Sequence, residues 1–175
     1  MRRVRFRCHR RRVLGVLSPP SYASDVIPDL SILVARVGNI HVPLPRYQTH
    51  GASGMDMHAA LPAPVTIAPG ERILVPTGLA FSIPSKFEAQ IRPRSGLAAT
   101  HGITVLNSPG TIDSDYRGEV KILLINLGQA AVTIAPLDRI AQMVIAPVAQ
   151  AGLFLVDLLD LTQRGAGGYG STGSE

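Results

Sequence analysis

Short apolar runs interrupted by Gly and Pro constrain the fold of this chain more than any other feature. Seventeen Gly and fourteen Pro are spread through a chain of 175 residues. Runs of this length, bounded by turn residues, fit strands of about four to eight residues better than long helices. The length also favours one domain with enough chain to bury a core. We therefore predict an all-β protein with one short helix.

The apolar runs place the expected elements along the chain. Pro76 and Gly78 predict a bend within a pair of strands, and Asp56 lies at the start of another strand. Ser95 is the expected N-cap of a helix of one or two turns over residues 97–101, which would offer free N–H groups to an anion. The expected extended segments cover residues 31–37, 41–45, 65–67, 72–82, 88–92, 103–106, 120–125, 131–134 and 139–147.

The segment 103–126 joins two strand-like runs through a polar loop that is longer than an ordinary hairpin connection. Val120, Ile122 and Leu124 share one face of the second strand, and Leu123 and Ile125 make the other face apolar, which predicts a core or a subunit interface. Polar groups held at the mouth of two strands are typical of a binding or catalytic site. The loop carries Asn107, Asp113, Asp115, Tyr116 and Arg117.

Positive charge is concentrated at the N-terminus. Residues 1–12 contain seven of the seventeen basic residues and none of the twelve acidic ones, so residues 13–175 carry 10 − 12 = −2. We interpret residues 1–29 as a flexible basic extension and linker. Weak polyanion binding and an organelle transit peptide are alternative interpretations of the arm.

The remaining composition limits the compartment. Cys8 is the only cysteine, which excludes an intrachain disulfide and fits a reducing compartment. No apolar run approaches the roughly 18 residues of a membrane-spanning helix. We therefore expect a cytoplasmic protein that does not enter a membrane, with organelle targeting by the arm left open.

Five motifs follow one another in a fixed order, and together they resemble those of the trimeric dUTPases. The first motif departs from the usual family pattern in its Ala-Ser order and in Met57, and it keeps Asp56. The resemblance covers roughly residues 30–175 and divides them into a β domain, residues 30–162, and a Gly-rich lid, residues 163–175. The motifs are residues 52–57 (ASGMDM), 93–98 (PRSGLA), 107–118 (NSPGTIDSDYRG), 139–143 (RIAQM) and 164–173 (RGAGGYGSTG).

The resemblance implies a jelly-roll-like β-barrel or sandwich that forms a homotrimer, in which the C-terminal tail of one chain closes over the site of another. The implied reaction is hydrolysis of dUTP to dUMP and pyrophosphate by attack of water on the α-phosphate. Mg²⁺ would be bound mainly by the substrate phosphates. The reaction would lower dUTP and supply dUMP for thymidylate synthesis.

The resemblance also implies roles for individual residues. Asp113 matches the general base, Tyr116 would pack under the deoxyribose, and Asp56 would contact the metal through water. Tyr169 would stack on the base from the tail. The implied substrate-binding set is Arg94, Ser95, Gly96, Asn107, Thr111, Ile112, Tyr116, Lys121, Gln142, Arg164, Tyr169, Gly170, Ser171 and Thr172.

Two other functions compete with this interpretation. The related dCTP deaminases need an acidic residue ten positions after the match to Asp113, where this chain has Leu123. A non-enzymatic nucleotide sensor on the same fold could lose the catalytic Asp or the tail, whereas this chain keeps both. We therefore predict a dUTP diphosphatase, with the sensor as the main alternative.

Overall fold

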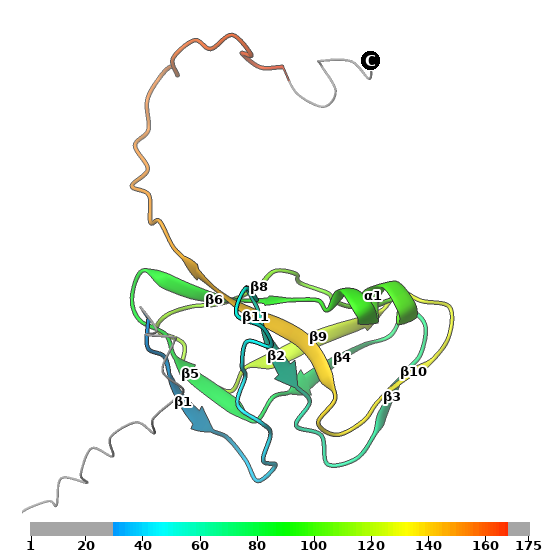
Figure 1. Cartoon of the computed structure of the whole chain (residues 1–175). Coiled ribbons are helices and arrows are strands. Elements are labelled where there is room, and N and C mark those ends of the chain that lie inside the picture. The colour runs from blue at the N-terminus through cyan, green and yellow to red at the C-terminus, as the bar shows by residue number, and fades with distance from the viewer. Residues whose placement is uncertain (1–29, 168–175) are drawn as a thin grey trace, which may run out of the picture. The chain divides into compact units, whose positions relative to one another are not determined.

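A computed structural model describes residues 30–167 of the chain (Figure 1). The chain divides into two units, Met1–Ser31 and Ile32–Glu175, and every element below belongs to the second. Residues 1–29, the N-terminal arm and linker, and residues 168–175, most of the expected lid, lie outside the described residues.

The described residues form strands and one short helix, which confirms the all-β prediction (Figure 1). No helix in residues 30–167 is long and apolar enough to cross a membrane, since α1 has seven residues. The elements are β1 (Leu33–Arg36), β2 (Met55–His58), β3 (Val65–Ile67), β4 (Arg72–Pro76), β5 (Leu79–Ser82), β6 (Phe87–Arg92), α1 (Ser95–His101), β7 (Ile103–Val105), β8 (Gly110–Ile112), β9 (Lys121–Asn126), β10 (Val132–Ile134) and β11 (Arg139–Pro147).

The strands pair across long sequence separations. One sheet has the order β2-β11-β6-β8 and a second has the order β4-β9-β7, while β1 pairs with β5 and β3 pairs with β10. All of these pairs are antiparallel. Because chain neighbours such as β4 and β5 belong to different sheets, the chain crosses repeatedly between sheets, as a jelly-roll-like fold requires.

Period-2 alternation places the core on one face of each long strand. Val120, Ile122 and Leu124 are buried, as their shared face predicts, and they meet Ile140 and Met143 of β11 in one apolar cluster. Each such side chain contributes about 1.5–3 kcal/mol relative to an exposed position. The other face of β9 packs less completely, since Leu74 of β4, paired with Leu123, is 54% exposed.

Several local expectations needed correction. Residues 41–45 form no strand, although Val42 is buried. The helix begins at Ser95, so the N-cap is Arg94, and no side chain caps it. The loop after β7 contains β8, which joins β6 in the other sheet, so the segment 103–126 is more than a simple hairpin. The expected bend at Pro76 and Gly78 is confirmed, because β4 ends at Pro76 and β5 starts in a different sheet.

A buried amide connects the end of β9 to two neighbouring segments. Asn126 has no exposed surface. Its Nδ2 donates to the carbonyls of Ile67 at 2.9 Å and Ala130 at 2.8 Å, and its Oδ1 accepts the N–H of Gly128 at 2.9 Å. One side chain therefore satisfies three backbone groups, and the bond to the Ile67 carbonyl is buried.

We expect Asn126→Ala to destabilise the fold, because the buried carbonyl of Ile67 alone would cost about 1–3 kcal/mol without its partner. Thr133→Val is the control, since it removes an exposed hydroxyl pair with Thr66 and should change the free energy of unfolding by less than about 0.5 kcal/mol. Urea unfolding at one protein concentration measures both. Equal losses in the two variants would contradict this role of Asn126.

Candidate functional site

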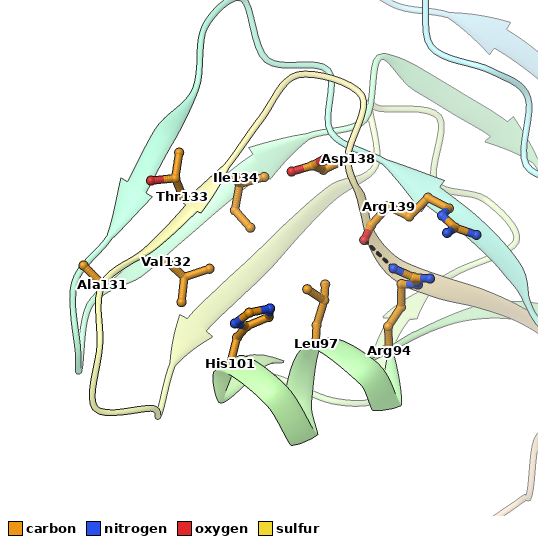
Figure 2. Close-up of a pocket in the computed structure, with 9 residues that line it drawn as sticks. All are labelled: Arg94, Leu97, His101, Ala131, Val132, Thr133, Ile134, Asp138 and Arg139. Carbon is orange, nitrogen blue, oxygen red and sulfur yellow. Dashed lines mark hydrogen bonds between the residues drawn. The ribbon is translucent and has the colours of Figure 1, made fainter.

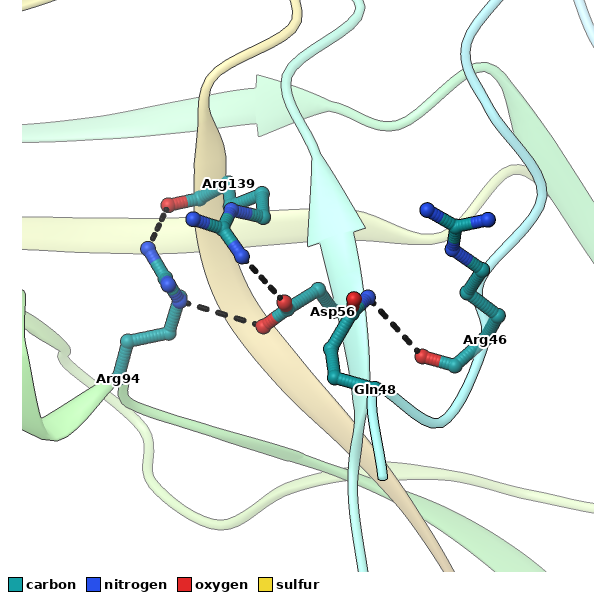
Figure 3. A network of polar contacts seen from close by, with 5 residues as sticks. All are labelled: Arg46, Gln48, Asp56, Arg94 and Arg139. Atoms are coloured by element: carbon teal, nitrogen blue, oxygen red, sulfur yellow. Dashed lines mark hydrogen bonds and ion pairs between the residues drawn. The ribbon is translucent and has the colours of Figure 1, made fainter. Parts of the chain in front are cut away.

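A buried carboxylate lies between two guanidinium groups (Figure 3). Asp56 on β2 is 5% exposed, and its Oδ1 lies 3.2 Å from Arg94 Nε, while its Oδ2 accepts a 3.1 Å hydrogen bond from Arg139 Nη1. The Arg94 contact is an ion pair rather than an aligned hydrogen bond, since Nε lacks a hydrogen-bond partner by geometry. Arg94 Nη1 also donates to the carbonyl of Arg139 at 2.9 Å. We name Asp56, Arg94 and Arg139 the arginine cluster.

Strand pairing brings this cluster together. On β11, Gln142 pairs with Asp56 of β2 on one side and with Arg92 of β6 on the other. The register of β11 and β2 shifts between Arg139 and Ala141, and an irregularity of this kind changes the direction of a side chain at a strand end. Arg94 arrives from the end of β6 just before α1. Three elements therefore supply the site from rigid positions.

Gln142 and Gly54 pack against each other beside the cluster. A Cβ added at Gly54 would lie 3.1 Å from Gln142 Oε1 and 3.3 Å from its Cβ. The small residue of the first motif therefore leaves room for the amide of the fourth motif. This contact explains why these two motifs belong to one site.

The surroundings of His58 carry excess positive charge. Burial is the main cause that lowers the pKa of His58 below its ordinary 6.5; Asp56 opposes the shift, and Arg139, Arg94 and Arg46 add to it. The imidazole is therefore neutral at pH 7. Two guanidinium groups, of Arg94 and Arg139, contact the single Asp56 carboxylate, and this net positive charge suits a polyanionic ligand.

A pocket of about 450 Å³ opens beside the cluster (Figure 2). Leu97 and His101 face it from α1, and Val132 and Ile134 face it from β10. Arg94 and Arg139 lie at one end (Figure 2). Ser95 and Gly96 begin α1 and are exposed, next to Arg94. The cationic end of this pocket and the start of α1 are therefore accessible to a ligand.

A second pocket of about 360 Å³ lies at the loop of the third motif, and we name it the hairpin pocket. Asp113 is exposed there, and its carboxylate makes no hydrogen bond with any residue of the described chain. A carboxylate without a protein partner can accept a proton from water. The pocket is lined by Leu74, Thr111, Ile112, Asp113, Tyr116, Glu119, Val120 and Lys121.

Hydrogen bonds within the loop fix the groups of the hairpin pocket. The Tyr116 N–H donates to the carbonyl of Asp113 at 3.2 Å, which closes a turn. Arg117 Nη1 donates to the carbonyls of Ser114 at 2.7 Å and Tyr116 at 2.8 Å. The Tyr116 hydroxyl donates to the carbonyl of Glu119 at 3.0 Å. The loop is therefore held by its own contacts.

The residues predicted from the sequence form two groups rather than one site. Arg94, Gln142 and Asp56 lie together at the arginine cluster, and Thr111, Ile112, Asp113, Tyr116 and Lys121 line the hairpin pocket. The two pockets share no lining residue. On β6, Arg92 pairs with Gln142 and Ala89 pairs with Ile112, which separates the groups by about 10 Å along that strand.

Among the described residues, Asn107 and Arg164 lie in neither group. Asn107 is exposed in the loop before β8 and lines neither pocket. Arg164 is exposed, and its Nε donates to the carbonyl of Gly167 at 2.8 Å. Tyr169, like the residues that follow it, lies outside the described residues.

The site also contains residues that were not assigned from the sequence. Arg139, which begins the otherwise apolar strand β11, is the second cation on Asp56. Glu119 accepts the N–H of Gly78 at 2.8 Å and lies 3.8 Å from Lys121 Nζ. Its partner is 41 residues away, so no local pattern could identify this contact.

Known proteins are similar to this chain in sequence and in fold. The dUTPase family model matches residues 40–173. A deoxyuridine 5'-triphosphate nucleotidohydrolase of Bdellovibrio bacteriovorus is 58% identical over 144 residues, which are 82% of this chain and 97% of that protein. The protein of the same name from Roseobacter denitrificans is 62% identical over 135 residues, 77% of this chain and 89% of that protein.

A solved structure agrees in fold. A mutant dUTPase of Staphylococcus bacteriophage 80alpha with dUpNHpp has a TM-score of 0.74 at 22% identity, over 82% of this chain and 98% of that chain. The motifs in their order, the antiparallel sheets that place them and the match over most of the chain lead to one conclusion: this chain belongs to the dUTPase family.

Proposed function

We propose that this protein hydrolyses dUTP to dUMP and pyrophosphate. The observation that carries the proposal is the exposed Asp113 carboxylate in a pocket that also contains Tyr116 and Lys121, in a chain that has a separate cluster of guanidinium groups. A lone carboxylate suits activation of water, and a guanidinium cluster suits a triphosphate. Relatives that match this chain over most of their own length carry this activity in their names.

In the proposed reaction, the oxygen of a water molecule attacks the α-phosphorus while the Asp113 carboxylate accepts a proton from that water. The bond from the α-phosphorus to the bridging oxygen breaks, and pyrophosphate leaves with the electron pair. Negative charge therefore grows on the leaving group, where positive groups stabilise the transition state more than the ground state. Arg94, with Ser95 and Gly96 beside it, is proposed to hold these phosphates.

The hairpin pocket is proposed to bind the nucleoside. Asn107, Thr111, Ile112 and Lys121 would read the uracil edge through side chains or backbone groups. Tyr116 would lie under the deoxyribose and exclude a 2′-hydroxyl. Leu123, the position where a deaminase would need an acidic residue, packs in β9 opposite Leu74, so the proposal does not extend to deamination.

We propose that the complete site forms between chains of a homotrimer. Within one chain the arginine cluster and the hairpin pocket lie apart. A second chain could place its hairpin pocket beside the arginine cluster of the first. The segment after β11 supports the same idea, because it carries a run of exposed apolar side chains such as Leu153 (94%) and Phe154 (89%). Exposed apolar runs of this kind usually mark a contact with a partner. The tail of one chain would then reach the site of another, where Arg164, Tyr169, Gly170, Ser171 and Thr172 would close over the ligand.

Mg²⁺ is proposed to arrive with the triphosphate. Residues 30–167 contain no group of three His, Cys, Asp or Glu side chains that could hold a metal, and both Asp56 oxygens contact guanidinium groups. The chain therefore offers a metal no direct ligand set in this part, and Asp56 could act on it only through water. When bound, Mg²⁺ neutralises phosphate charge.

Two expectations about the whole chain stay predictions. The cytoplasmic location and the weak polyanion binding of the arm both depend on residues 1–29, which lie outside the described residues. The release of dUMP for thymidylate synthesis follows from the proposed reaction.

We expect Asp113→Asn to lower kcat for dUTP by about 10²–10⁴-fold, the usual cost of losing a general base. The fold and the KM should change little, because the Asp113 side chain supports no other residue. Asp115→Asn is the matched control, since Asp115 is exposed on the same loop and does not line the pocket. Pyrophosphate release measures both. Unchanged turnover in the Asp113 variant would refute its role as base.

We expect a chain truncated before Arg164 to stay folded and trimeric but to lose most activity, because the removed segment would supply phosphate contacts and no core. Truncation before Ala151 should also weaken the trimer, since it removes the exposed apolar run. Sedimentation and pyrophosphate release separate the two effects. Full activity of the chain truncated before Arg164 would show that the tail is not a lid.

A further inference from the structure

Two residues of the hairpin loop, Gly118 and Glu119, control where the Tyr116 ring lies, although neither has a role in the proposed reaction. The Tyr116 hydroxyl donates to the backbone carbonyl of Glu119 at 3.0 Å. Both Tyr116 and Glu119 line the hairpin pocket. The position of the ring in that pocket therefore depends on the short segment that follows it.

Gly118 provides the space for the ring. A Cβ added at Gly118 would collide with the Tyr116 hydroxyl and would lie 2.6 Å from Cζ and 3.0 Å from Cε2. Cβ atoms in proteins do not approach other atoms this closely, so the ring would have to move. The backbone of Gly118 does not adopt the left-handed conformation, so the tyrosine ring, rather than the backbone, is what requires glycine here.

Glu119 anchors the carbonyl that receives the hydroxyl. Its carboxylate accepts the Gly78 N–H at 2.8 Å and lies 3.8 Å from Lys121 Nζ. Val120, the next residue, is held by two hydrogen bonds. Its carbonyl accepts from Thr77 Oγ1 at 2.6 Å, and its backbone N–H donates to the carbonyl of Leu79. The turn between β4 and β5 therefore holds the segment that holds the ring.

We propose that Gly118 and Glu119 are positioning residues that set the selectivity of this site for deoxyribose over ribose. Gly118 lets the ring occupy the space beside the loop backbone, and Glu119 fixes its hydroxyl end. A ring fixed at both points presents a rigid wall, and a rigid wall can reject one added hydroxyl by steric exclusion and loss of its water. The inference rests on the proposed function, because it assigns a cause to the sugar selectivity of that same site.

The test measures kcat/KM for dUTP and for UTP with the full-length protein. We expect Gly118→Ala to raise the UTP to dUTP ratio of kcat/KM by about tenfold or more, while kcat for dUTP falls much less than in Asp113→Asn. Gly51→Ala is the matched control, because a Cβ at Gly51 has nothing within 4 Å and its backbone is not left-handed. Its ratio should equal that of the unmodified protein.

A second pair of variants keeps the inference testable if Gly118→Ala does not fold. Glu119→Ala removes the carboxylate that accepts the Gly78 N–H and should raise the UTP to dUTP ratio of kcat/KM. Glu119→Gln keeps an acceptor for that N–H, so its ratio should equal that of the unmodified protein. A simple loss of stability would lower both substrates equally and leave the ratio unchanged. If the unmodified protein does not hydrolyse dUTP, the proposed function fails. If it does and neither Gly118→Ala nor Glu119→Ala changes the ratio, the inference is overturned.

Discussion

The contact of Asp56 with two arginines holds the cationic part of this protein together. A carboxylate buried to this extent would be costly alone, and breaking such a pair by removing one partner usually costs several kcal/mol. Here the carboxylate joins β2, the start of β11 and the segment before α1. Because one Asp56 carboxylate compensates only part of the charge of Arg94 and Arg139, the cluster is both ordered and still cationic. This combination suits a site that must hold phosphates in one place.

The second constraint is the separation of this cluster from the carboxylate that would perform the chemistry. The pairing of β11 with β6 and of β6 with β8 keeps the strand positions beside these groups about 10 Å apart along β6 within one chain. In the proposed homotrimer a second chain supplies the other half of the site, and the exposed apolar run from Leu153 to Leu161 is the surface proposed to contact a partner chain. Under this proposal, catalysis depends on trimer formation.

The sequence predicted the elements better than their partners. Alternation in Val120–Leu124 identified a buried strand face, and Pro76 and Gly78 identified a bend, since both signals are local. The sequence did not predict strand β8, because Gly110 and Thr111 lack an apolar pattern and the pairing of β8 with β6 is a long-range contact. The pairing of Asp56 with Arg139 spans 83 residues, so only the folded chain could show it. The motif residues were identified by family resemblance, whereas their division into two groups was not.

Mixed trimers test the central claim, that the site combines residues from different chains. Asp113→Asn and Arg94→Gln are each inactive if both residues are needed, and the two variants are unfolded and refolded together. If Arg94 and Asp113 of one site come from different chains, random mixing restores about a quarter of the wild-type sites, because each mixed trimer regains one intact site. The account predicts that pyrophosphate release from dUTP recovers to about that level. No recovery in mixtures that do contain mixed trimers would contradict it.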